Sequence, residues 1–299
     1  MQLGVFSILF PVLLAVVMFS LGLALTVADF AHVLAVPRAV LITLLCQVVL
    51  LPALCFGLVV GSGLGPDLAV GMMVLAASPG GAMASVFSHL AGGDVALNIT
   101  VTAINSVLAV FTLPVVVALS VGHFLGSDAT VGLRAGEVVQ IGLVVLVPVA
   151  LGMTVRRRLP AFTDRIQKPL RTTTIIAVFV AIVASILPQS DGFLWGLAAV
   201  GLVCLLFSTL SLTVGYVVPR LVRIGHRQAV AASMEVGIHS AILAITVTIT
   251  VLDNPIAAVA PAMYGALMYL PAAAFAWLVG RRARQARPST AAEGVAEPG

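Results

Sequence analysis

The sequence predicts an all-α membrane protein with nine transmembrane helices, arranged as inverted repeats with two discontinuous helices. Apolar residues make up 61% of the 299 residues, charged residues only 9%, and the mean hydropathy is +1.19. Soluble domains usually carry about 25% charged residues, whereas a membrane helix needs about 20 mainly apolar ones. Apolar segments of that length recur throughout the chain, and two of them carry matching interruptions. The candidate spans lie near residues 3–28, 37–60, 67–90, 95–121, 134–155, 170–188, 193–219, 227–252 and 255–280.

The basic residues predict the orientation of these spans. If the N-terminus lies outside, every Lys and Arg except Arg134 falls on the cytoplasmic side. Cytoplasmic loops are enriched in Lys and Arg, so we expect an odd number of spans and a cytoplasmic C-terminus. The start, Met1-Gln2-Leu3, lacks the basic region of a signal peptide, so the first span is expected to be retained.

The remaining composition narrows the class of protein. The net charge of +4 is explained by the basic residues expected on the cytoplasmic side of the membrane, so no nucleic-acid partner is expected. Cys46, Cys55 and Cys204 lie in apolar spans without a CxxC pair, which favours packing over a disulfide or metal cluster. We expect one transmembrane domain over residues 1–283, and a disordered cytoplasmic tail over residues 284–299.

The two interruptions occur in spans that cross the membrane in opposite directions. The span near 67–90 contains Ala77-Ser78-Pro79-Gly80-Gly81-Ala82, and the span near 227–252 contains Met234-Glu235-Val236-Gly237-Ile238-His239-Ser240. Proline removes a backbone donor and glycine loosens a helix, so Pro79, Gly80, Gly81 and Gly237 mark the expected breaks. Broken helices in matching places of two halves are the best sequence pointer to a secondary transporter's binding site.

The breaks also belong to a wider resemblance. The chain is similar to the sodium/bile acid symporter family through Gly22-Leu23-Ala24-Leu25, Asp29-Phe30, Pro37-Arg38, Gln47, Pro52, Ala77-Ser78-Pro79-Gly80-Gly81, Leu90-Ala91-Gly92-Gly93-Asp94-Val95-Ala96-Leu97 and Glu235-Val236-Gly237. The resemblance implies alternating access around a crossing of the two broken helices. It also implies a panel domain (spans near 3–28, 134–155 and 170–188) and a core domain (spans near 37–121 and 193–280).

The resemblance carries the family's two sodium sites over only in part. Glu235, Gln47 and Thr102 match side-chain ligands of Na⁺, and Val236 matches a backbone ligand. Asn98 stands in place of a serine, Ala84-Ser85 in place of Ser-Asn, and His239-Ser240 in place of Gln-Asn. Hard cations need oxygen ligands, and several oxygen donors of the family's sodium sites are altered in this chain. Either Na⁺ or H⁺ is therefore expected as coupling ion, with no other cofactor. The expected ion-binding residues are Glu235, Gln47, Thr102, Val236, Asn98 and His239.

Glu235 is the only acid well inside a span, and no Lys or Arg lies at membrane depth beside it. A charge at the bilayer centre costs roughly 2.5–3.5 kcal/mol. Glu235 must therefore be protonated, hold a cation or face a charged His239, one helical turn further on. Two alternatives stay open: a permanently protonated structural Glu235, and a neutral His239 bonded to a carbonyl or to Gln47.

The breaks also predict the substrate. Each restarts a helix whose N-terminus favours anions, one near Ala82 to Ser85 and the other near Ile238 to Ser240. We expect a small organic anion, such as a bile acid-like molecule, a keto acid or another carboxylate. The expected substrate-binding residues are Ser85, Ser240, Ala82, Met83 and Asn105. The prolines expected to kink their helices are Pro52, Pro114, Pro148, Pro261 and Pro271.

These features predict a secondary active transporter coupled through Glu235, in a bacterial inner membrane. The alternative is a sodium-independent facilitator or efflux carrier. An intramembrane enzyme using Glu235 and His239 would need a nucleophile or metal set that the spans lack, so no enzyme is expected. The substrate and the lipid bilayer are the expected partners, and the protein is expected to be a monomer.

Overall fold

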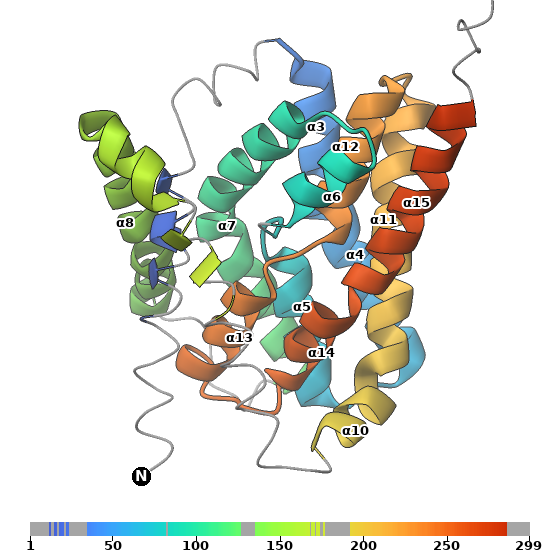
Figure 1. The fold of residues 1–299 in the computed structure, drawn as a ribbon. Helices are drawn as coiled ribbons and strands as arrows, with labels where there is room; N and C mark the ends of the chain where they lie inside the picture. The colour runs from blue at the N-terminus through green and yellow to red at the C-terminus, as the bar shows by residue number, and fades with distance from the viewer. Residues whose placement is uncertain are drawn as a thin grey trace, which may run out of the picture.

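The described part of the chain is helical. The computed structural model describes residues 35–81, 83–126, 135–167 and 192–285, with isolated positions between 12 and 23 and between 169 and 176. The elements are α3 (Pro37–Leu45), η2 (Cys46–Leu50), α4 (Leu51–Ser62), α5 (Pro66–Ala77), α6 (Ala84–Leu90), α7 (Val95–Phe124), α8 (Ala135–Arg158), α10 (Gly192–Gly196), η3 (Leu197–Gly201), α11 (Leu202–Leu221), α12 (His226–Gly237), α13 (Ala241–Thr250), α14 (Val259–Leu267) and α15 (Tyr269–Gln285) (Figure 1).

Some of these helices are long and apolar enough to cross a membrane. Within the described residues these are Pro37–Ser62, Leu194–Leu221 and Val259–Val279, and α7 is a fourth if its two bent halves form one span. The all-α membrane fold is therefore supported. The expected number of nine spans stays a prediction, because the spans near 3–28 and 170–188 lie mostly outside the described residues.

Two prolines distort their helices. The halves of α7 meet at 56° between Ala109 and Phe111, and the ring of Pro114 crowds the carbonyl four residues earlier, which explains the kink. Before Pro52, η2 is a π-helical turn in which the Leu51 N–H donates to the Cys46 carbonyl. Such turns are often found at functional sites, and this one carries the buried Gln47.

The helices α5 and α12 are built alike. Each has 12 residues, and each follows a glycine with nearly the same backbone angles, Gly65 (φ −56°, ψ 148°) and Gly225 (φ −56°, ψ 150°). Each ends at an extended residue, Ser78 or Ile238, after which a shorter helix begins. Both interruptions expected from the sequence are thus present.

The two breaks cross each other. Gly80 and His239 form an isolated antiparallel bridge. The Gly81 N–H donates to Ile238 O at 2.6 Å, and the Ser240 N–H donates to Pro79 O at 2.9 Å. Backbone groups freed at the breaks therefore satisfy each other, as a non-helical segment at membrane depth requires.

The far ends of the two broken helices are held in a similar way. The Asp94 N–H, at the start of α7, donates to the Arg227 carbonyl in the first turn of α12 at 3.0 Å. At the opposite end, Asn254 Nδ2 donates to Asp67 Oδ1 in the first turn of α5 at 2.6 Å. Each broken helix is thus bound near its start by the connection that follows the other break, which is the arrangement of an inverted repeat.

Glycines bring α8 close to the first segment of the chain. A Cβ on Gly22 would overlap the Val149 carbonyl, and one on Gly152 would overlap the Phe19 carbonyl. Small residues at such crossings are typical of membrane helices.

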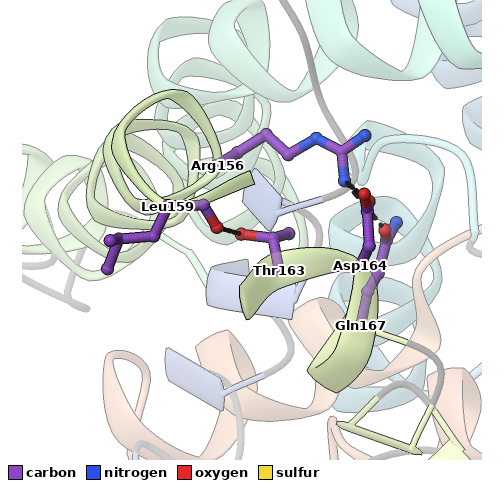
Figure 2. A network of polar contacts seen from close by, with 5 residues as sticks. All are labelled: Arg156, Leu159, Thr163, Asp164 and Gln167. Carbon is purple, nitrogen blue, oxygen red and sulfur yellow. Dashed lines mark hydrogen bonds and ion pairs between the residues drawn. The ribbon is translucent and has the colours of Figure 1, made fainter. Parts of the chain in front are cut away.

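After α8 the chain turns back on itself. Arg156 Nη1 donates to Asp164 Oδ1 at 2.6 Å and to Gln167 Oε1 at 3.4 Å, and Thr163 Oγ1 donates to Leu159 O (Figure 2). Both members of the ion pair are partly exposed, so the pair contributes little to stability.

Several helix ends that carry or adjoin basic residues lie on the same side of the helix bundle. In Figure 1 the start of α3, the α11–α12 connection and the end of α15 all lie at the top of the bundle. Arg38, Arg220, Arg223 and Arg227 lie in or beside these segments. The fold is thus compatible with one basic membrane face, while its assignment to the cytoplasm stays a prediction.

Candidate ion and substrate site

Glu235 lies in the last turns of α12 and is fully buried. Thr102 Oγ1 is 2.7 Å from Glu235 Oε1 and 2.8 Å from Oε2, and Asn98 Nδ2 donates to Oε2 at 3.1 Å. Asn98 and Thr102 are four residues apart on α7, so one face of that helix presents both to the carboxyl group. Three of the expected ion-binding residues are therefore in direct contact.

Two amide oxygens near the breaks lack a hydrogen-bond donor in the part of the chain that the structure describes. Asn98 uses its Nδ2 for Glu235 and for the Ala231 carbonyl, which leaves Asn98 Oδ1 buried without a partner. Gln47 Nε2 donates to the Ser78 carbonyl at 3.2 Å, and Gln47 Oε1 is likewise buried and unpartnered. Because buried polar atoms are nearly always satisfied, both oxygens are suited to a cation or a water.

Within the described part of the chain, the carboxyl group of Glu235 has no basic partner, because the one ion pair found there joins Arg156 to Asp164. An unpaired buried charge is very costly. A proton or a bound cation on Glu235 would remove that cost.

Gly80 lets the first break pass directly over this carboxyl group. A Cβ on Gly80 would overlap Glu235 Oε1, and one on Gly81 would come within 2.8 Å of the His239 carbonyl. The Pro-Gly-Gly sequence thus does more than unwind a helix, because its missing side chains make room for the carboxyl group and for the second break.

His239 is bonded to Tyr264 and not to Glu235. Its Nδ1 lies 3.2 Å from the Tyr264 hydroxyl, which donates to the Gly237 carbonyl at 2.8 Å. The ring is also 5.6 Å from that of Phe207, between centroids. The Glu–His contact is not formed in the described residues, and His239 bonds a tyrosine hydroxyl instead of the carbonyl or the Gln47 side chain of the alternative expectation.

Tyr264 was missed in the sequence analysis. It lies in the apolar helix α14 and is fully buried. A tyrosine inside a membrane helix needs a partner for its hydroxyl, and that need could have singled it out.

Gly237 lies at the expected break and has a packing role in addition. It is the last residue of α12, and the extended segment starts at Ile238. A Cβ on Gly237 would overlap the side chain of Leu212 on α11, so the glycine is needed for close packing of two helices. In a continuous helix the Ser240 N–H would donate to the Val236 carbonyl. Here it donates to Pro79 O instead, so the Val236 carbonyl lacks its usual helical donor.

Three of the expected substrate-binding residues adjoin the two breaks. Met83 and Ser85 stand at the start of α6 and Ser240 immediately before α13, all three partly buried. Asn105 is buried on α7, and no described residue accepts from its Nδ2. Ala82 lies outside the described residues.

An all-helical membrane bundle in which two interrupted helices cross beside a buried carboxyl group has the architecture of a secondary transporter. The chain belongs to the Sodium Bile acid symporter family, whose sequence model matches residues 11–194. The match includes the first break and the α7 residues, and it ends before Glu235.

Named relatives agree with this assignment. The chain is 28% identical to the probable chloroplastic sodium/metabolite cotransporter BASS2 of Oryza sativa subsp. japonica, over 90% of this chain and 63% of that protein. It is 26% identical to the uncharacterized sodium-dependent transporter YocS of Bacillus subtilis (strain 168), over 85% and 77%. It is 31% identical to the ileal sodium/bile acid cotransporter of Mus musculus, over 62% and 53%.

The chain thus spans less than two thirds of the length of the rice and mouse relatives. All three relatives are named as transporters or cotransporters and none as an enzyme, in agreement with the expectation from the sequence.

Proposed function

We propose that this protein is a secondary active transporter of a small organic anion, driven by a cation that binds at Glu235. The observation that carries the proposal is a fully buried carboxyl group without a basic partner, held by Thr102 and Asn98 beside two crossing breaks. Such a group inside a membrane is a functional site by default.

Sodium fits the atoms that surround the carboxyl group. Glu235, Thr102 and Asn98 Oδ1 would supply oxygen ligands, with Gln47 Oε1 and the Val236 carbonyl near the breaks. Sodium is also in the names of the rice, Bacillus and mouse relatives.

A proton can bind to the Glu235 carboxyl group within the same set of hydrogen bonds, without movement of heavy atoms. The Thr102 hydroxyl has one proton and reaches both carboxyl oxygens and the Asn98 carbonyl, the last at 2.9 Å. With Glu235 ionised, Thr102 donates to it. With Glu235 protonated, the carboxyl donates to Thr102, which donates in turn to Asn98 O.

The anion would bind at the crossing. The first turns of α6 and α13 point their N–H groups toward the breaks, and helix N-termini favour anions. Ser85, Ser240, Met83, Ala82 and Asn105 are the proposed contacts. A carboxylate there and a cation at Glu235 lie close enough to favour each other's binding, which is the basis of coupling.

Alternating access would follow from motion of the proposed core (spans near 37–121 and 193–280) against the proposed panel (spans near 3–28, 134–155 and 170–188). The close glycine crossings at Gly22 and Gly152 support pairing of the first and fifth spans. We place the protein in a bacterial inner membrane, with its N-terminus outside and its C-terminus in the cytoplasm.

Reconstituted vesicles test the proposal. Uptake of small labelled carboxylates is measured with an inward Na⁺ gradient at equal pH, and with an inward H⁺ gradient without Na⁺. E235Q should abolish the response to either gradient while the protein stays folded. D164N, which removes a charge at the exposed Arg156 pair, should behave like the wild type. Full gradient-driven uptake by E235Q, or exchange in the wild type that ignores both ions, would instead favour the sodium-independent facilitator.

A further inference from the structure

A single buried hydroxyl reaches both sides of the second break. Tyr264 on α14 is fully buried, and its hydroxyl donates to the Gly237 carbonyl at 2.8 Å. The same hydroxyl oxygen lies 3.2 Å from Nδ1 of His239. Gly237 is the last residue of α12, and His239 belongs to the extended segment that follows. One side chain of a neighbouring helix therefore holds both ends of the interruption.

The Gly237 carbonyl needs this donor because of the break itself. In a continuous helix the Ala241 N–H would donate to it, but here that N–H donates to the His239 carbonyl at 3.0 Å. A buried carbonyl without a donor is costly inside a membrane. Since the Tyr264 hydroxyl has one proton and gives it to Gly237, its oxygen accepts from His239 Nδ1–H.

The position of the hydroxyl is fixed by its surroundings. The Tyr264 ring packs against the rings of Phe207 and His239, with centroid distances of 5.7 and 5.5 Å. Phe207 and His239 are themselves 5.6 Å apart, so the three rings form one buried cluster. On α11, Ser208 and Ser211 lie beside the same hydroxyl as polar neighbours. Tyr264 thus ties the second break to two helices that are not interrupted there.

The Tyr264 hydroxyl and the Glu235 carboxyl group belong to separate sets of hydrogen bonds. Glu235 is held from α7, by Asn98 and Thr102. Tyr264 bonds the residues that lead from the end of α12 toward α13. Loss of the hydroxyl should therefore disturb the start of α13 more than it disturbs the carboxyl group.

We propose that Tyr264 is a positioning residue for the carried anion. By holding Gly237 and His239, its hydroxyl fixes the direction in which the chain enters Ser240 and the first turn of α13. This inference rests on the proposed function, which places one side of the anion site there. Without the hydroxyl the segment loses its fixed path, and anion binding must restore the order that the tyrosine supplies in advance.

Exchange of Tyr264 for phenylalanine removes the hydroxyl and keeps the ring. In reconstituted vesicles Y264F should raise the KM for the carboxylate about 5- to 50-fold, as expected for a buried carbonyl left without its donor. The maximal rate should stay nearly unchanged, because the loss is one of binding. The Tm shift that Na⁺ alone causes should also match the wild type, since Glu235 keeps its bonds.

The matched control is Y216F. It removes a tyrosine hydroxyl that lies 3.1 Å from Nδ1 of His226, a contact of the same kind and similar length, but at the start of α12. Y216F should keep the wild-type KM. A carboxylate KM in Y264F equal to that of Y216F, or a lower maximal rate at unchanged KM, would show a purely structural role and overturn the inference.

Two further comparisons keep the result decisive. Should Y264F fail to fold, H239A removes the second contact of the hydroxyl on the break, and its KM is compared with that of Y216F in the same way. A wild type that takes up no carboxylate refutes the proposed function and this inference with it. A wild type that takes up carboxylate without responding to a cation refutes only the coupling, and the KM comparison still tests Tyr264.

Discussion

Gly80 and His239 lie opposite each other in an antiparallel bridge at the point where the two broken helices cross. The bonds on either side, Gly81 to Ile238 and Ser240 to Pro79, use backbone groups that neither break could satisfy alone. The two breaks are therefore one structural unit, and a displacement of either must disturb the other. Glu235 packs directly against this unit through Gly80.

Replacing Gly80 by alanine should disable the carrier. The new Cβ would overlap the Glu235 carboxyl group, whose neighbours are fixed by hydrogen bonds. Overpacking of this kind costs about 1–3 kcal/mol of folding free energy, and coupled uptake should be lost. Thermal unfolding and vesicle uptake measure both effects. G57A, in a helix position with open space around it, should be neutral or stabilising. If G80A took up substrate at the wild-type rate, the close contact between Gly80 and the Glu235 carboxyl group would not be needed.

The hydroxyl of Thr102 should set the affinity for the coupling cation. Valine has nearly the same shape but loses the bonds of 2.7 and 2.8 Å to Glu235. Hydrogen bonds to charged groups contribute about 1.5–3 kcal/mol, so T102V should weaken the apparent affinity for the cation about 10- to 100-fold. The matched control is T248V, because the buried Thr248 bonds only carbonyls of its own helix. Equal cation dependence in the two variants would exclude a role for Thr102.

Local features of the sequence were enough to locate the crossing and its carboxyl group. Pro79 and the two glycines after it cannot continue a regular helix, and a glutamate at membrane depth stands out by its charge. Gln47, Asn98 and Thr102 were added by the family resemblance. Of these, Asn98 and Thr102 contact Glu235, while Gln47 bonds the first break.

The orientation of His239 could not be predicted in this way. A spacing of four residues suggested a contact with Glu235, but the helix ends at Gly237, so the helical geometry no longer applies. The true partner, Tyr264, lies on another helix.

The likeness of α5 and α12 was also hidden in the sequence. Aligned at Gly65 and Gly225, they share only Ala69 with Ala229 and Val70 with Val230. What the two helices have in common is mainly backbone geometry and crossing contacts, which many different side chains permit.

The free oxygen of Asn98 should contribute to cation binding, whereas the free donor of Asn105 should not. Asn98 Oδ1 and Asn105 Nδ2 are both buried and unpartnered on α7, but only Asn98 contacts Glu235. N98A should lower the apparent affinity for the cation at least tenfold. N105A should raise the KM for the carboxylate and leave the cation dependence unchanged. Uptake measured against each concentration in turn separates the two effects, and the reverse pattern would exchange the two roles.

Gly237 should be required for packing and not for flexibility, and a double-mutant cycle can distinguish the two. A Cβ at this position would overlap the Leu212 side chain on α11, so G237A should lower the free energy of unfolding by about 1–3 kcal/mol. L212A alone leaves a cavity and should cost about 2–5 kcal/mol. In the double variant the added methyl group enters the space left by leucine, so the combined loss should be smaller than the sum of the single losses. If the glycine served instead as a hinge, removing Leu212 would not rescue it, and the two losses would simply add. Thermal or denaturant unfolding of the four proteins in the same detergent measures the cycle, and uptake measured alongside shows whether restored packing also restores transport.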